Sequence, residues 1–261
     1  MAKQVYIFTH IPKCGGRSVY RFFLNVFGEE QVLGLHTRPD LAQKFYKGEL
    51  DLGRYRAVCG HATFGTEARI DGVEPLYIGL LRDPLERFVS LFNFYRMIEL
   101  EKDDVLLRQM QQAKSCETAE QYYHQLLQDD DPNWLTSNIQ ASYITGTRAL
   151  DAGTVMDAVD RNYHLLMPLE NIDLFLGQIA AEIGVTKFGV PRANASDKYF
   201  SSTQLSPEFL TLFRRRSDLD YLAYYYLKTK VRAKRTEMAE ADRQELRRLR
   251  QRRFMFFGWP S

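Results

Sequence analysis

The chain has 261 residues, 45% hydrophobic and 13% aromatic, so it can bury a sizeable core, and disorder over most of its length is excluded. Its formal net charge of +2 is too small to indicate nucleic-acid binding by itself. Three cysteines form neither a disulfide framework nor a metal-binding cluster, which favours a reducing compartment. With no signal peptide and no apolar run of about 18 residues, we expect a cytoplasmic protein, unless an anchoring segment has been removed.

The amino-terminal third alternates short apolar runs with helical patterns. An apolar run at 5–8 ends in a polar loop, and helical spacing follows from Val19 to Phe27. A proline at position 84 opens another helix, which extends to about residue 100. Further strands are expected at 32–35, 57–60 and 76–81. This alternation predicts a three-layer α/β domain, in which helices flank a central, mainly parallel sheet.

The second half is expected to be mostly helical. Residues 101–146 contain no strand-like run, so we expect helices throughout this region. One more strand is expected at 164–169, followed by a helix that ends at Ile183. A polar loop at 191–203 then leads to a helix over 205–230.

The carboxyl-terminal segment differs in character from the rest. Residues 228–253 contain eleven Lys or Arg and four Asp or Glu, and so carry +7 of a chain whose net charge is +2. We therefore expect one domain over 1–230 and a basic helical extension over 231–261. Membrane or nucleic-acid binding by this tail is the less favoured interpretation. We prefer a solvated helix whose aromatic end docks on its own domain or on a second copy of the chain.

A glycine pair lies between the first strand and the first helix, in the sequence IPKCGGRS at 11–18. Gly15 and Gly16 allow backbone N–H groups to approach an anion closely, and the helix N-terminus adds its dipole. Lys13 supplies a point charge, while Arg17 and Ser18 add donors. Such a loop can hold a phosphate or a sulfate, although an ordinary turn with an incidental lysine fits the glycines equally well. A Walker A loop would need GK followed by Ser or Thr, which is absent.

A second motif, R-x-P-x-x-R-x-x-S, follows the apolar run at 76–81. Arg82 at the end of a strand offers a bidentate fork to a phosphate, and Ser90 offers a hydroxyl about two turns into the helix. We expect Arg87 to bind phosphate less directly or to pair with Asp83 or Glu86. In isolation, the motif also fits a cluster of salt bridges at a helix start.

Together and in this order, the two motifs resemble those of carbohydrate sulfotransferases that use 3′-phosphoadenosine 5′-phosphosulfate (PAPS). In that family the first loop is typically IPKTGGTS and holds the 5′-phosphosulfate, and the second motif binds the 3′-phosphate. Here Cys14 and Arg17 replace hydroxyl residues, which keeps the backbone cradle but alters side-chain contacts. Weaker resemblances, including N-x-Q at 138–140 and N-x-S at 194–196, extend the match over residues 4–230.

The resemblance implies a P-loop-like fold, PAPS as the donor and no metal. The residues that it implies in contact with PAPS are Lys13, Cys14, Gly15, Gly16, Arg17, Ser18, Arg82, Ser90, Asn194, Ser196 and Lys198. Lys13 would also stabilise the charge that develops on the leaving nucleotide, 3′-phosphoadenosine 5′-phosphate (PAP).

The base for the incoming hydroxyl is expected to be His61. It lies in GHATFG at 60–65, which resembles the G-H-x-x-F-G segment in which the family's catalytic histidine lies. A histidine satisfied by backbone at a strand end is the alternative, and His10, Glu67 and Glu74 are the other candidate bases. The three remaining histidines, His36, His124 and His164, are expected to be structural or exposed. Residues expected beside the acceptor are Phe64, Arg69, Tyr95 and Arg96.

These expectations describe an O-sulfotransferase of the cytoplasmic, bacterial type that acts on a glycan or another hydroxyl-bearing acceptor. A Golgi-lumenal domain without its anchor would have the same sequence. Two other functions stay open. One is a kinase-like phosphotransferase that uses ATP and Mg²⁺, with Asp83 as a metal ligand. The other is a protein that binds PAP or a sulfated glycan without turnover. Nucleic acid is not an expected partner, and self-association is left open.

Overall fold

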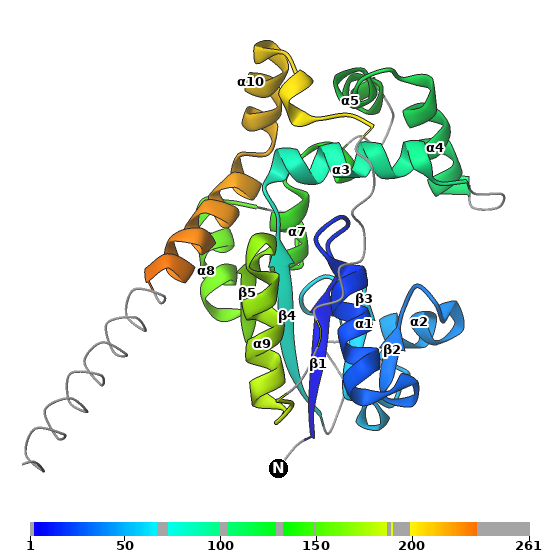
Figure 1. The fold of residues 1–261 in the computed structure, drawn as a ribbon, viewed down its shortest axis with the longest axis vertical. Helices are drawn as coiled ribbons and strands as arrows, with labels where there is room; N and C mark the ends of the chain where they lie inside the picture. Colours follow the sequence, from blue (N-terminus) through cyan, green and yellow to red (C-terminus); the bar gives the residue numbers. More distant parts are fainter. Residues whose placement is uncertain are drawn as a thin grey trace, which may run out of the picture.

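The computed structural model describes residues 3–66, 73–99, 104–128, 133–148, 150–186, 189 and 199–233. Within these ranges, five parallel strands form one sheet in the order β2-β3-β1-β4-β5 (Figure 1). Their bounds are Lys3–Thr9 (β1), Val32–Gly34 (β2), Ala57–Gly60 (β3), Val73–Leu81 (β4) and Leu165–Pro168 (β5). Each lies where an apolar run predicted a strand, and the α/β fold with a parallel central sheet is confirmed.

The sheet is buried on both faces, which explains why its strands are apolar without interruption. Successive side chains of β1 alternate between two hydrophobic cores. Tyr6 and Phe8 pack in the larger core, whereas Val5 and Ile7 pack in the smaller one.

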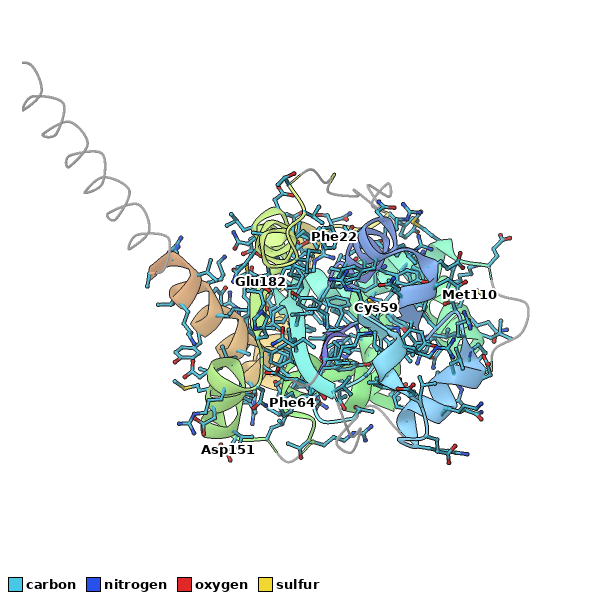
Figure 2. The ribbon with its side chains drawn as sticks, turned by 90° about the horizontal axis from the view of Figure 1, so that it is seen from below. Phe22, Cys59, Phe64, Met110, Asp151 and Glu182 are labelled. Atoms are coloured by element: carbon cyan, nitrogen blue, oxygen red, sulfur yellow. The ribbon has the colours of Figure 1, made fainter. Side chains whose placement is uncertain are left out.

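Helices complete the outer layers. The first helix after β1 is α1 (Gly16–Phe27), and α9 (Ile172–Glu182) follows β5. Phe22 of α1 and Glu182 of α9 lie on one side of the sheet, whereas Phe64 and Asp151 lie on the other (Figure 2). The smaller core also receives Phe45 from α2 (Pro39–Tyr46).

A group of helices covers the carboxyl end of the sheet. Helix α3 crosses above the end of β4, and α4, α5 and α10 lie beyond it (Figure 1). The helices between β4 and β5 are α3 (Pro84–Met97), α4 (Asp104–Ser115), α5 (Ala119–Gln128), α6 (Asn133–Thr136), α7 (Ile139–Thr145) and α8 (Ala152–Arg161). Short 3-10 helices are η1 (Glu29–Gln31), η2 (Leu52–Arg54), η3 (Leu169–Asn171) and η4 (Ser202–Gln204). None of the helices in the described ranges has the length and apolar character needed to cross a bilayer.

The helix predicted over 205–230 is two helices in the structure. Helix α10 (Pro207–Arg216) ends at Ser217, whose backbone angles of −115° and 26° leave the helical region, and a second helix occupies 218–233. The apolar spacing continues across Ser217, so the pattern alone does not reveal this break. The rest of the predicted basic extension lies outside the described residues, and the expected domain boundary at 230 stays a prediction.

The helix over 218–233 is held to the body of the protein by paired contacts. Glu170 accepts a hydrogen bond of 2.8 Å from the Tyr224 hydroxyl and lies 3.1 Å from the Lys228 ammonium. Two residues further on in each case, Tyr226 donates to Asp160 at 3.0 Å and Lys230 pairs with the same carboxylate. The first basic residues of the tail are therefore paired with acidic residues of the domain.

Candidate anion-binding and catalytic site

The predicted site residues follow strands that lie side by side. His10 follows β1, His61 follows β3 and Arg82 follows β4, and these strands are neighbours in the sheet. Because all strands are parallel, their carboxyl ends meet at one edge, where open α/β sheets bind ligands. The first loop, the histidine segment and the second motif are therefore together in space.

The glycine pair is required by packing as well as by backbone geometry. Gly15 has a φ of 80°, and a Cβ there would lie 2.7 Å from Leu169 Cδ1. At Gly16, where α1 begins, a Cβ would lie 1.9 Å from His10 Nε2. Among the described residues, no side chain caps the N-terminus of α1, and the Ser18 N–H donates to the Gly15 carbonyl at 3.0 Å. The positive end of the α1 dipole lies at the sheet edge, and anion binding there stays a prediction.

Lys13 stands among other cations. Its backbone φ of 69° is left-handed, which is rare for a residue with a side chain, and its Nζ lies 4.1 Å from the centre of the Phe94 ring. Burial and the neighbouring Arg82 and Arg17 lower the pKa of Lys13 to about 8. The Arg82 guanidinium also donates to the Lys13 carbonyl at 3.3 Å. Three positive charges thus lie close together where the resemblance predicted phosphate binding, and clustered cations suit an anionic ligand.

The second motif begins with a capped helix. Asp83 Oδ1 accepts hydrogen bonds of 3.0 Å and 3.1 Å from the N–H groups of Leu85 and Glu86. This carboxylate therefore has a structural function at the start of α3, which accounts for an acidic residue there without a metal ion. Ser90 is half-buried on the same helix.

Arg87 was expected to pair with Asp83 or Glu86, and neither ion pair is present among the described residues. Glu86 instead lies 3.8 Å from Arg82. Arg87 is only 3% exposed, and its Nε and Nη1 atoms have no hydrogen-bond partner among the described residues. Its positive charge lowers the pKa of the buried Asp220. Arg87 therefore interacts with the interior of the protein and not with the surface of the site.

His61 is fixed in one tautomer by a backbone contact. Its Nδ1 lies 2.7 Å from the carbonyl oxygen of His10, and the two imidazole rings stack with centres 4.5 Å apart. A carbonyl oxygen only accepts, so Nδ1 carries the hydrogen and Nε2 keeps its lone pair. Loss of water around the ring lowers the pKa of His61, and the bond to the His10 carbonyl opposes this shift. The ring is therefore neutral at pH 7 and can accept a proton at Nε2.

A third histidine joins this pair. His36, two residues beyond β2, has its ring centre 6.1 Å from that of His10 and 6.5 Å from that of His61. Burial, followed by the nearby His61, His36 and Lys13, holds the pKa of His10 well below its usual value. His36 lies in no recognisable sequence motif, although its position just after a strand is the signal shared with His10 and His61.

The residues predicted beside the acceptor lie mostly in packing positions. The Phe64 ring packs at a tilt against Tyr77, with ring centres 4.6 Å apart, and Tyr95 is only 3% exposed. Arg96 donates to the Ala113 carbonyl at 3.2 Å. All three thus have packing or hydrogen-bonding partners within the fold, and their contact with an acceptor stays a prediction.

The carboxylate predicted as an alternative base is on the wrong end of its strand. Glu74 lies at the amino end of β4, where it accepts from Gln4 Nε2 at 3.1 Å. At about 3.3 Å per residue it is roughly 25 Å from Arg82 at the other end. Predicted residues that lie outside the described residues are Glu67, Arg69, Asn194, Ser196 and Lys198.

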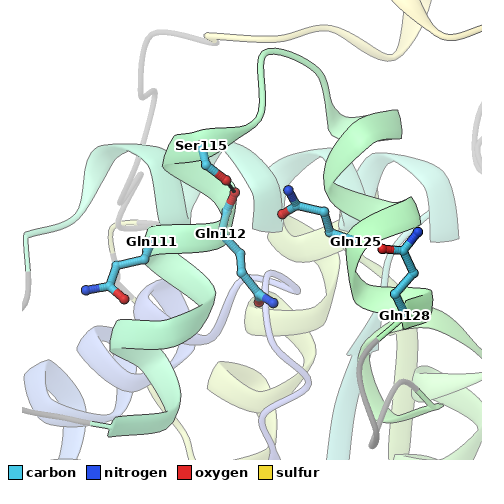
Figure 3. Close-up of a pocket in the computed structure, with 5 residues that line it drawn as sticks. All are labelled: Gln111, Gln112, Ser115, Gln125 and Gln128. Carbon is cyan, nitrogen blue, oxygen red and sulfur yellow. Dashed lines mark hydrogen bonds between the residues drawn. The ribbon is translucent and has the colours of Figure 1, made fainter.

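A shallow pocket lies away from this site, between α4 and α5. It has a volume of about 470 Å³ and is lined by Gln111, Gln112, Ser115, Gln125 and Gln128 (Figure 3). These side chains are amides and a hydroxyl, with no charged group or nucleophilic thiol. The pocket therefore contributes nothing to anion binding or proton transfer at the sheet edge.

Comparisons with known proteins give little guidance. No family model matches the chain, and no curated protein matches it significantly. Among solved structures, the chain is similar to one described as a crystal structure of a fungal RNA kinase. That similarity has a TM-score of 0.32 and 13% sequence identity, and covers 82% of this chain and 96% of that chain. A likeness this weak does not define an activity.

Proposed function

We propose that the protein is a PAPS-dependent O-sulfotransferase whose acceptor is a carbohydrate hydroxyl. The proposal is supported by one arrangement at the sheet edge: His61 is bonded through Nδ1 to the His10 carbonyl, His10 packs against the glycine loop, and Lys13 lies near the charges of Arg82 and Arg17. A group transfer to a hydroxyl needs these parts, namely a base for the hydroxyl and positive charge for the anionic donor.

The chemistry assigns one task to each part. The acceptor oxygen attacks sulfur, its proton passes to Nε2 of His61, and the bond from sulfur to the 5′-phosphate oxygen breaks. PAP leaves with the electron pair of that bond, and Lys13 stabilises the charge on its oxygen. By the family resemblance, Arg82 and Ser90 hold the 3′-phosphate, while the loop from Cys14 to Ser18 holds the 5′ end. In-line placement of acceptor and donor supplies the remaining rate acceleration.

A kinase-like phosphotransferase is the second candidate, because the same cradle suits the phosphates of ATP. This candidate requires Mg²⁺ close to the phosphates. The carboxylate that the sequence suggested for it, Asp83, is engaged as the cap of α3. We therefore rank it below the sulfotransferase, whose two separate phosphate anchors match the two motifs.

Calorimetric titration of the full chain with PAP, and separately with ATP and MgCl₂, distinguishes the candidates. We expect PAP to bind more tightly, and Arg82→Ala to weaken PAP binding by about tenfold or more, since a charge-assisted contact is lost. Binding of ATP with Mg²⁺ and not of PAP would reject the sulfotransferase. PAP binding without sulfuryl transfer from PAPS to any of a panel of glycans would favour the non-catalytic alternative.

A further inference from the structure

A buried glutamine connects the two phosphate-binding parts of the site. Gln140 of α7 has no exposed surface. Its Oε1 accepts from the backbone N–H of Arg82 at 2.9 Å, and its Nε2 donates to the Arg82 carbonyl at 2.8 Å. β4 ends at Leu81, so Arg82 has left the ladder of the sheet. Because buried backbone groups need partners, one side chain replaces both ladder bonds of this residue.

The same amide oxygen also reaches the glycine loop. Cys14 Sγ donates to Gln140 Oε1 at 3.5 Å, and this thiol is fully buried. Burial raises the pKa of Cys14 to about 12, so the thiol stays protonated and remains a donor. Gln140 therefore contacts the loop after β1 and the motif after β4 at once, through bonds to the residues beside Lys13 and at Arg82.

Gln140 is itself held from a distant part of the chain. The carboxylate of Asp220, in the helix over 218–233, accepts from the N–H of Ala141 at 2.8 Å. Asp220 is only 2% exposed. Burial raises its pKa to about 6, while the nearby Arg87 charge opposes this rise. The first turn of α7, and with it the Gln140 side chain, is thereby anchored to a rigid element.

We propose that Gln140 is a positioning residue that sets the separation between the glycine loop and Arg82. It would thereby create the preference for a nucleotide with two separate phosphates over one with a single 5′-phosphate. This inference rests on the proposed function, in which the loop takes the 5′-phosphate and Arg82 the 3′-phosphate. The amide touches no ligand, and it acts through the backbone of Arg82 and the Cys14 thiol.

The test compares binding of PAP with binding of 5′-AMP, which lacks the 3′-phosphate. Gln140→Met keeps the length and volume of the side chain and removes its hydrogen bonds. We expect the ratio of the two affinities to fall about tenfold, chiefly through weaker PAP binding. Gln140→Asn keeps the amide but shortens it, so the bonds to Arg82 are lost, and we expect the same fall in the ratio.

The matched control is Gln109→Met. Gln109 of α4 is also buried, at 5% exposure, and its Oε1 has no hydrogen-bond partner among the described residues. We expect this variant to keep the wild-type ratio. Both Gln140 variants are compared with the wild type only after thermal unfolding confirms that they are folded. If Gln140→Met does not fold, the comparison is made with Gln140→Asn alone.

The possible outcomes separate the two claims. A wild-type protein that binds PAP no better than 5′-AMP contradicts the proposed function itself. A wild-type preference for PAP that persists in the folded Gln140 variants contradicts the positioning role alone. Equal weakening of both nucleotides would indicate a general structural contribution and would also overturn the inference.

Discussion

His61 and Lys13 both have pKa values below their usual range, and for each the lowered pKa has a different consequence. A low pKa keeps His61 neutral at pH 7, which is the form that a base requires. The pKa of Lys13 is also lowered, to about 8, so this lysine loses its charge in mildly alkaline solution. At the scale of single residues, the site is therefore sensitive to acid through one group and to alkali through the other.

We expect an acidic limb in kcat/KM for sulfuryl transfer as His61 becomes protonated, at a pH below that of an ordinary histidine because burial lowers its pKa. His61→Ala should lower kcat/KM by about 10²- to 10⁴-fold and abolish this acidic limb. The measurement is a pH–rate profile with PAPS and a glycan acceptor. His124→Ala, on α5, is the control, and an acidic limb that survives in His61→Ala would show that another group is the base.

The charge on Lys13 is present below its pKa and is lost above it. We therefore expect PAP affinity to fall by about tenfold or more from about pH 7 to about pH 9.5, because the neutral amine no longer attracts the phosphate. In Lys13→Arg the guanidinium stays charged over this range, so its PAP affinity should vary little with pH. Calorimetric titration at each pH gives both curves, and parallel curves would contradict the assignment.

Helix α3 begins where the second motif needs it to begin. Asp83 caps its first turn, and Pro84 occupies the first helical position, where a missing N–H costs nothing. The Asp83 cap and the Gln140 side chain together fix the backbone conformation on both sides of the Arg82–Asp83 peptide bond. At the scale of elements, the arginine is thus presented by a strand end and a helix start rather than by a free loop.

Substitution of Asp83 tests its structural assignment against the metal-ligand alternative. Asp83→Ala should lower the free energy of unfolding by about 1 kcal/mol, whereas Asp83→Asn should change it little, because asparagine caps as well as aspartate. Urea unfolding measures both. Transfer activity should survive in Asp83→Asn. Loss of activity in a folded Asp83→Asn variant would contradict a purely structural role for this carboxylate.

At the scale of the whole molecule, the helix over 218–233 contacts several parts of the domain. Its Asp220 holds the start of α7, and Tyr224 contacts Glu170 beside β5. The buried charge of Arg87 acts on the same aspartate. The helical layer and the sheet edge are therefore joined by polar contacts between residues far apart in the sequence.

Removal of the Asp220 carboxylate should be strongly destabilising. Asp220→Ala removes the buried acceptor of the Ala141 N–H, and we expect a loss of about 2 kcal/mol in the free energy of unfolding. Asp218→Ala, at an exposed neighbouring position, should cost less than about 1 kcal/mol. Chemical denaturation at pH 7 compares the two variants, and similar losses would contradict a specific contribution from Asp220.

The sequence alone determined the strands and the positions that follow them. Strands buried on both faces require continuous apolar runs, so all five were visible in the sequence. His61, Lys13 and Arg82 were predicted from motifs that follow three of these runs. The glycine pair was visible as well, since a helix start that approaches an anion needs residues without side chains.

Only the tertiary structure decided how these residues are supported. Gln140 lies 58 residues from Arg82, and Asp220 lies 79 residues from Ala141, so no local pattern links either pair. His36 joins the other histidines only because β2 lies beside β3 in the sheet. Local periodicity records which face of an element is buried. The partners of a buried polar group depend on how distant elements pack, which a single sequence does not encode in any local signal.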